Sequence, residues 1–170
     1  MIPRATTPIS YRPDISIRAQ DGETIALVEV KNAKVLSHDA ALELYHDVIA
    51  ESTAAQAPYF LLLSQRLGFL WGQRGTRRDR DAVPLAEFAM RGVVARYLPD
   101  LAEGDWLRGQ ELTFILSQWL FSLATGQQTP TDEPEKTLAG IGFLAVIEGA
   151  IVALEPSVGI PAAKQVALAV

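Results

Sequence analysis

Acidic and basic side chains near the start of the chain have types and spacings that suit catalysis. Asp14 follows a proline, and Glu29 is separated from Lys31 by one residue. Because side chains alternate between the two faces of a strand, Glu29 and Lys31 share a face if this segment is extended. Two carboxylates can hold a divalent cation such as Mg²⁺ together with water molecules. This chemistry requires that the fold bring Asp14 to Glu29.

A predicted hairpin supplies that proximity. Asp21-Gly22 lies between two runs of alternating residues, a strong local signal for a two-residue turn of type I′. With these residues as the loop, Gln20 pairs with Glu23. Counting outward sets further pairs on two faces: Ile17–Ala26, Ile15–Val28 and Pro13–Val30 on an apolar face, and Ser16–Leu27, Asp14–Glu29 and Arg12–Lys31 on a polar one.

The predicted pairing of Asp14 with Glu29 needs a compensating charge. Directly opposed residues on antiparallel strands lie roughly 4.5–5.5 Å apart at Cβ, and like charges placed there are destabilising. A bound divalent cation would remove the repulsion. The alternative is a solvated hairpin face on which the repulsion is tolerated, or is relieved by Arg12 and Lys31. The register leaves both interpretations open.

The composition describes a globular domain without a global attraction for nucleic acid. Hydrophobic residues make up 49% of the 170 residues and charged residues 21%, which argues against disorder. The net charge of −5 means that any phosphate binding must be local. The absence of cysteine excludes disulfides and thiolate metal sites. The first residues lack the pattern of a signal peptide, so we expect a cytoplasmic protein.

The first half of the chain predicts the order β-β-α-β-β, an α/β or α+β layer. Ser37 is the expected N-cap of a helix that runs through about residue 52 on apolar residues at helical spacing. An almost continuous apolar run over 58–64 suits a strand covered on both faces, and 67–72 follows closely enough to pair with it.

The second half is expected to be mainly helical. Helical patterns cover 85–98 and 105–124, and an apolar helix from 135 is expected to run into a short strand at 150–154. Residues 138–154 approach the length of a membrane span, but three glycines and Glu148 favour a buried segment. We therefore expect a core over 1–82 and a helical extension over 83–170 packed on it as one compact unit, with no membrane partner.

Pro13-Asp14 and Glu29-Val30-Lys31, each on a strand and followed by a helix and another strand, resemble the PD-(D/E)XK nuclease superfamily over about residues 11–72. The resemblance implies a mixed β-sheet with a restriction-endonuclease-like core. It implies that Asp14, Glu29 and the backbone carbonyl of Val30 ligate Mg²⁺ or Mn²⁺, and that Lys31 holds the attacking water or stabilises the transition state. The implied reaction is hydrolysis of phosphodiester bonds, with DNA favoured over RNA as the substrate.

The chain departs from this family before Asp14. The family core usually begins with a helix and a strand, whereas thirteen residues precede Asp14 here. Residues 4–11 are a candidate for the strand, but a full helix does not fit. We therefore expect a shortened member or a fold that another chain completes.

Other basic and aromatic residues are weaker candidates for substrate binding. These are Arg12, His46, and Arg74, Arg77 and Arg78 of a basic loop. Acidic neighbours favour a solvated loop, and a lone helical histidine is more often a surface or packed residue. The tryptophans could stack on bases, but their apolar neighbours favour core packing. They are Trp71, Trp106 and Trp119.

A second interpretation is a catalytically silent relative that acts as a protein-interaction or oligomerisation module. The apolar helices expected after Leu85 motivate it, and they offer a surface for a homodimer. Neither a Gly-x-Ser-x-Gly motif nor a phosphate-binding Gly-Lys-Ser/Thr loop occurs, which leaves the acidic pair as the concentrated chemical signal.

Overall fold

The computed structural model describes residues 12–32, 36–50, 57–72, 83–102, 104–128 and 130–155. They form a fold built around one mixed β-sheet. Within these ranges the fold is α+β, with six strands and five helices. The strands are β1 (Ile15–Arg18), β2 (Thr24–Lys31), β3 (Tyr59–Ser64), β4 (Leu67–Gly72), β5 (Ala86–Ala89) and β6 (Ile151–Leu154). The helices are α1 (His38–Ala50), α2 (Arg91–Tyr97), α3 (Gly109–Ala124), α4 (Glu135–Gly140) and α5 (Phe143–Ile147).

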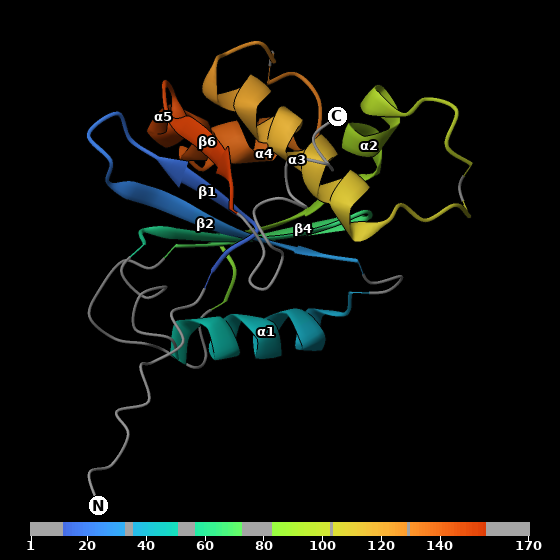
Figure 1. Ribbon diagram of the computed structural model, residues 1–170, viewed down its shortest axis with the longest axis horizontal. Helices are drawn as coiled ribbons and strands as arrows, with labels where there is room; N and C mark the ends of the chain where they lie inside the picture. The colour runs from blue at the N-terminus through green and yellow to red at the C-terminus, as the bar shows by residue number, and fades with distance from the viewer. Residues whose placement is uncertain are drawn as a thin grey trace, which may run out of the picture.

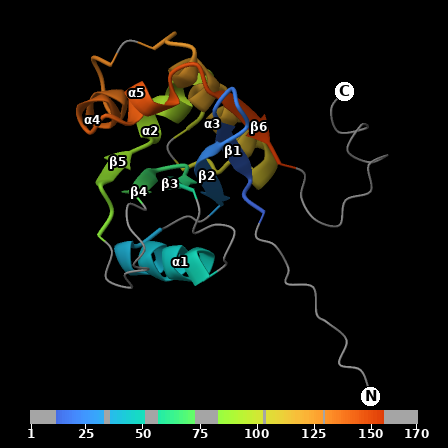
Figure 2. The ribbon, with the colours of Figure 1, turned by 90° about the vertical axis from the view of Figure 1, so that its left-hand side faces the viewer.

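The sheet separates two helical layers. Its strand order is β5-β4-β3-β2-β1-β6, with β2 and β3 parallel and the other neighbours antiparallel. Helix α1 covers one face, and α2 to α5 lie on the other (Figures 1 and 2). Both faces of β3 are therefore covered, which explains why its sequence is an almost continuous apolar run.

The predicted register of the first hairpin is confirmed for Ile15–Val28, Ser16–Leu27 and Ile17–Ala26. The predicted loop is wrong. The N–H of Ala19, and not that of Gln20, donates a hydrogen bond to the carbonyl of Glu23. The loop therefore has three residues, and its last residue, Gly22, has a φ of +92°. An irregularity in β2 then shifts the pairing back by one residue, since Arg18 pairs with Thr24 and Ile17 with Ala26.

Helix α1 begins as the sequence predicts. The Ser37 hydroxyl accepts a hydrogen bond from the N–H of Ala40 at 3.1 Å, which is an N-cap. The helix packs its apolar side on the sheet, where Tyr45 stacks on Trp71 with ring centroids 4.5 Å apart. Because β2 and β3 are parallel, the connection between them must cross a face of the sheet, and α1 is that crossover.

The second half differs from the mainly helical prediction. Residues 86–89 form β5 at one edge of the sheet, and the helix predicted over 85–98 is limited to α2. The predicted apolar helix from 135 is two short helices, which Gly142 separates with φ +84°. Strand β6 lies where a short strand was expected. None of the helices in the described ranges combines the length and apolar character needed to cross a bilayer.

Strand β6 lies beside β1, on the side away from β2. Its pairs with β1 are Ile15–Leu154, Ser16–Ala153, Ile17–Val152 and Arg18–Ile151. A later segment of the same chain thus occupies this edge of the sheet, and the expectation that another chain completes the fold stays a prediction. The candidate strand over 4–11 lies outside the described residues. Since β5 and β6 belong to the same sheet as β1 to β4, the second half is part of the core.

Candidate functional site

Asp14 lies immediately before β1, where the backbone ladder with β2 changes. Its N–H donates to the carbonyl of Val28 at 3.0 Å. Its side-chain Oδ2 accepts a hydrogen bond from the N–H of Val30 at 2.8 Å. In a regular ladder the N–H of Val30 would meet the carbonyl of Pro13. The Asp14 carboxylate takes that acceptor position and is thereby fixed against β2.

Glu29 and Lys31 flank the residue that Asp14 contacts. They are two residues apart on β2, so they share a face of the sheet. It is the face covered by α1, because Leu27 on the same side of β2 belongs to the apolar cluster that includes Tyr45 of α1. The Lys31 Nζ lies 3.2 Å from Glu29 Oε1, and the two side chains are 38% and 16% exposed. The lysine therefore balances part of the acidic charge and still reaches solvent.

The backbone carbonyl of Val30 faces β1. On β2 the even-numbered residues bond toward β1, as the Val28 carbonyl and the Val30 N–H show. The N–H and C=O of one residue point to the same neighbouring strand, so the Val30 carbonyl points there as well. Pro13 has no N–H and cannot donate to it. The local sequence thus leaves a carbonyl without its regular ladder donor beside the Asp14 carboxylate.

These oxygen atoms suit a hard cation. Two carboxylates and one carbonyl are ligands that Mg²⁺ accepts, with water and substrate oxygens completing six positions. Among the described residues, no group of three or more acidic or histidine side chains is placed to hold a metal ion. A site of this kind requires only one or two carboxylates, so the donor set of Asp14, Glu29 and Val30 fits Mg²⁺ or Mn²⁺.

Glu155, directly after β6, is a neighbour of Asp14 that the sequence analysis missed. Its N–H donates to the carbonyl of Asp14 at 3.0 Å. Its carboxylate accepts hydrogen bonds from the Ser16 hydroxyl at 2.6 Å and from Arg18 at 3.0 Å. Asp14 therefore lies between β2 and the end of β6. No local signal points to Glu155, since it lies 139 positions after Ser16 and 137 after Arg18 and only the pairing of β6 with β1 brings them together.

The weaker candidates lie at different places. Arg12 is exposed and precedes Pro13, next to the site. His46 lies on α1 beside Tyr45, with ring centroids 6.2 Å apart, and its buried Nε2 has no hydrogen-bond partner within the described part of the chain. The basic loop with Arg74, Arg77 and Arg78 lies outside the described residues.

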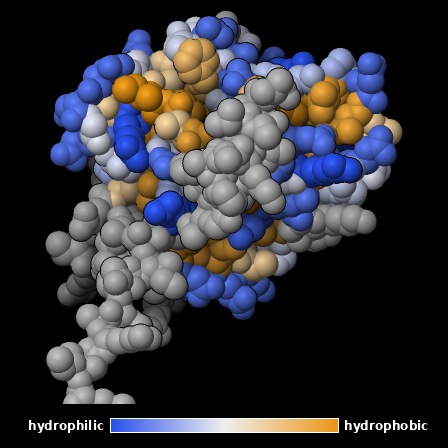
Figure 3. Space-filling view, in the orientation of Figure 1, coloured by the Kyte–Doolittle hydropathy of each residue, from blue (hydrophilic) through white to orange (hydrophobic). Residues whose placement is uncertain are grey.

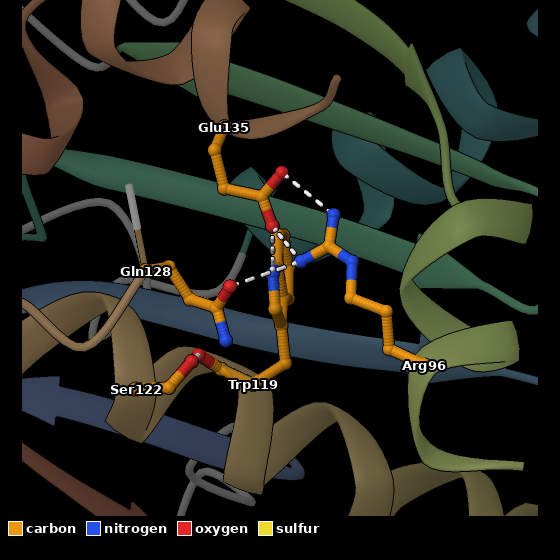
Figure 4. A network of polar contacts seen from close by, with 5 residues as sticks. All are labelled: Arg96, Trp119, Ser122, Gln128 and Glu135. Atoms are coloured by element: carbon orange, nitrogen blue, oxygen red, sulfur yellow. Dashed lines mark hydrogen bonds and ion pairs between the residues drawn. The ribbon is translucent and has the colours of Figure 1, made fainter. Parts of the chain in front are cut away.

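A buried ion pair elsewhere in the fold has the most perturbed charges. Glu135 is 1% exposed, and its carboxylate accepts hydrogen bonds from both terminal nitrogens of Arg96 and, at 3.0 Å, from Trp119 Nε1 (Figure 4). Burial by itself would raise the pKa of Glu135, but the bonds from Arg96 and Trp119 lower it below its ordinary value. With its oxygens engaged by three donors, Glu135 joins α2, α3 and α4 and is a structural group.

The Asp14 carboxylate thus contacts the backbone of Val30, and the neighbours of Val30 on β2, Glu29 and Lys31, form an ion pair. The strand pairs of the hairpin begin at Ile15–Val28, so the predicted pairing of Asp14 with Glu29 is not among them. Comparison of the chain with protein-family models, with curated proteins and with solved structures found no match.

Proposed function

We propose that the chain is a divalent-cation-dependent phosphodiesterase of the PD-(D/E)XK type that acts on nucleic acid, with DNA favoured over RNA. One observation carries the proposal: the Asp14 carboxylate is bonded to the backbone N–H of Val30, between Glu29 and Lys31 on the neighbouring strand.

The residues of the site have distinct roles in this proposal. Asp14, Glu29 and the Val30 carbonyl hold the cation. When bound, the cation stabilises charge on the phosphate oxygens and lowers the pKa of a coordinated water. Lys31 orients the attacking water and neutralises charge that develops on the phosphoryl group, because its ammonium lies on the same face as Glu29 and is 38% exposed. Hydrolysis by water needs no covalent intermediate with the protein.

The decisive experiment compares wild type with Asp14→Asn and Lys31→Ala. Asn retains an oxygen that can accept from Val30 while removing the charge. The proteins are incubated with single-stranded, duplex and branched DNA in Mg²⁺, Mn²⁺ or EDTA. We expect divalent-dependent cleavage by wild type and a loss of roughly 10²–10³-fold in both variants. Asp47 is an exposed carboxylate on α1, so Asp47→Asn is the matched control and should cleave as wild type does. Equal cleavage by all four proteins would refute the site.

Thermal unfolding tests cation binding without a substrate. A ligand that binds only the folded state raises the melting temperature by mass action. Millimolar Mg²⁺ or Mn²⁺ should therefore raise the melting temperature of wild type and of Asp47→Asn but not that of Asp14→Asn. An equal rise in all three proteins would place the cation elsewhere.

An apolar surface supports the second candidate, a catalytically silent interaction module. Phe121 of α3 and Ile151 of β6 are 48% and 49% exposed, and both line a hollow of about 580 Å³. Apolar residues gather over α5 and β6 on the face in Figure 3. This candidate predicts no effect of divalent cations on melting, and a self-association in sedimentation experiments that Phe121→Ser abolishes.

A further inference from the structure

A partly exposed tryptophan lies at the end of the sheet that carries the proposed site. Trp71 and Trp119 are 1% and 0% exposed and belong to the core, as the sequence predicts, whereas Trp106 is only partly buried. The guanidinium carbon of Arg66 lies 4.7 Å from the centre of the Trp106 ring. An aromatic ring paired with a guanidinium offers two planar surfaces on which a nucleobase can stack.

The fold holds Trp106 in place through a buried amide. Gln65, 8% exposed, follows β3 and donates from Nε2 to the carbonyl of Asp105 at 2.8 Å. Its Oε1 accepts a hydrogen bond from the N–H of Leu107 at 3.0 Å. These two hydrogen bonds fix the backbone on both sides of Trp106. The Asp105 carboxylate bonds to the N–H of Ala102, so it is held against the backbone of its own loop. An aromatic side chain on a fixed backbone is a preorganised binding element.

Two connections bring this element to the proposed site. Lys31 at the end of β2 pairs with Ser64 at the end of β3, two residues before Arg66. Helix α3 begins at Gly109, where a Cβ would lie 3.9 Å from Cβ of Asn32, the residue after Lys31. A strand of nucleic acid that contacts both Lys31 and Trp106 would cross this end of the sheet, because the Lys31 side chain lies on the α1 face and α3 lies on the other (Figure 1).

Arg66 also lines a pocket of suitable chemistry. The pocket has a volume of about 390 Å³, within the range of small-ligand sites. Its lining combines apolar side chains from α2 and the loop after it with three polar ones. The apolar residues are Val94, Ala95, Leu98, Leu101 and Ala102, and the polar ones are Gln65, Arg66 and Arg91. Apolar side chains suit the face of a base, and arginine side chains suit a phosphate.

We propose that this pocket, together with Trp106, over whose ring the pocket-lining Arg66 lies, binds an unpaired nucleotide, so that the preferred substrate of the proposed site is single-stranded nucleic acid or a duplex with single-stranded ends. This inference rests on the proposed function for the identity of the bound strand. A fully paired duplex keeps its bases stacked on one another and gains nothing from Trp106. Recognition by stacking is tolerant of sequence, and the phosphate contacts make it sensitive to salt.

The test measures binding in EDTA, where the proposed chemistry cannot proceed. Fluorescein-labelled oligo(dT) and a blunt duplex of equal length are titrated with each protein, and anisotropy reports the affinity. We expect Trp106→Ala to weaken oligo(dT) binding about tenfold, since stacking contributes about 1–3 kcal/mol per base, and to change duplex affinity less than about twofold. Trp106→Phe should restore part of the loss, because it retains an aromatic face.

Two controls and a catalytic variant separate the possible failures. Phe114→Ala removes an aromatic side chain that is 57% exposed on α3, and Lys136→Ala removes an exposed charge on α4; both should bind oligo(dT) as wild type does. Asp14→Asn should bind oligo(dT) and fail to cleave it. Binding by Trp106→Ala equal to that of wild type, an equal loss for oligo(dT) and duplex, or no binding of oligo(dT) by wild type would overturn the inference. Trp106-dependent binding without any divalent-dependent cleavage would refute the proposed function alone.

Discussion

Glu29 and Glu135 are both carboxylates with basic partners, but their surroundings give them different roles. Lys31, the partner of Glu29, lies two residues away and is 38% exposed, so the spacing alone predicts the pair. Arg96, the partner of Glu135, is 39 residues away on another helix. Nothing local in the sequence indicates that pair, because the packing of α2 against α4 creates it. Ion pairs between neighbours on one strand are predictable from spacing in a way that ion pairs between distant helices are not.

The Arg96–Glu135 pair should make stability depend on acid. The pKa of Glu135 is lowered in the folded protein, so its contribution is present above the unfolded pKa of about 4.3 and is lost as the pH falls through the folded value. Glu135→Gln removes this charge and should lower the free energy of unfolding by about 2 kcal/mol at pH 7, less than the roughly 3–5 kcal/mol typical of fully buried pairs, because Arg96 is partly exposed. Urea unfolding between pH 7 and 3 should show the difference from wild type shrinking below about pH 4. A difference that is constant over this range would contradict the assignment.

At the scale of elements, the first hairpin shows why a register can be predicted when its turn cannot. Asp-Gly suits both a two-residue turn and a three-residue loop with glycine in the left-handed conformation. The chain adopts the longer loop, which displaces the pairing by one residue, and the irregularity in β2 displaces it back. The burial of Ile15, Ile17, Ala26 and Val28 on one face selects this outcome, since a slip of one residue would expose them all. The hydrophobic pattern therefore specifies the pairing of Ile15 with Val28 and of Ile17 with Ala26 more strongly than the turn does.

Strand β5 was not predicted from the sequence because the residue that favours it, Gly68, lies on the neighbouring strand β4. Residues 85–90 alternate between exposed and buried, the period of a strand, although their composition suits a helix. Phe88 pairs with Gly68 of β4, and its ring lies against that glycine. A Cβ atom added at Gly68 would lie 2.2 Å from Cε2 of the Phe88 ring. Glycine opposite an aromatic residue on the neighbouring strand is thus what lets this short edge strand form. The sequence alone does not show which glycine faces Phe88.

The contact between Gly68 and Phe88 predicts a strong coupling. Gly68→Ala should lower the free energy of unfolding by about 1–3 kcal/mol, because the buried ring cannot move away from the new methyl group without disturbing β5. In the Phe88→Leu background the same change should be less destabilising, so a double-mutant cycle in urea should give a coupling energy well above zero. Gly140→Ala is the control, with no atom within 4 Å of its Cβ position, and should leave stability equal or higher. Additive effects in the cycle would show that the ring is not the obstacle.

At the scale of the whole molecule, the two ends of the described chain meet at the proposed site. Residues 12–18 bring Asp14 to β2, and the segment that ends at Glu155 forms the edge of the sheet on the other side of β1. The sequence predicted both strands but not their adjacency, because pairing between segments about 140 residues apart leaves no periodic trace. The boundary expected near residue 82 does not divide the sheet: β5 and β6 come after it in sequence and lie at opposite edges of a sheet whose four central strands come before it.

A single sheet shared by both halves should unfold in one transition. Trp71 reports on the core under α1, and Trp119 on the core under α3. Two variants isolate them: Trp106→Phe with Trp119→Phe leaves Trp71, and Trp71→Phe with Trp106→Phe leaves Trp119. In each variant we expect the urea midpoint from tryptophan fluorescence to coincide with that from far-UV circular dichroism, as for a two-state domain. The variant that lacks Trp119 should be less stable, since Glu135 loses a donor, but its two midpoints should still agree. A fluorescence midpoint that precedes the dichroism midpoint in one variant only would mean that the two layers unfold separately and that β5 and β6 are attached to an independent core.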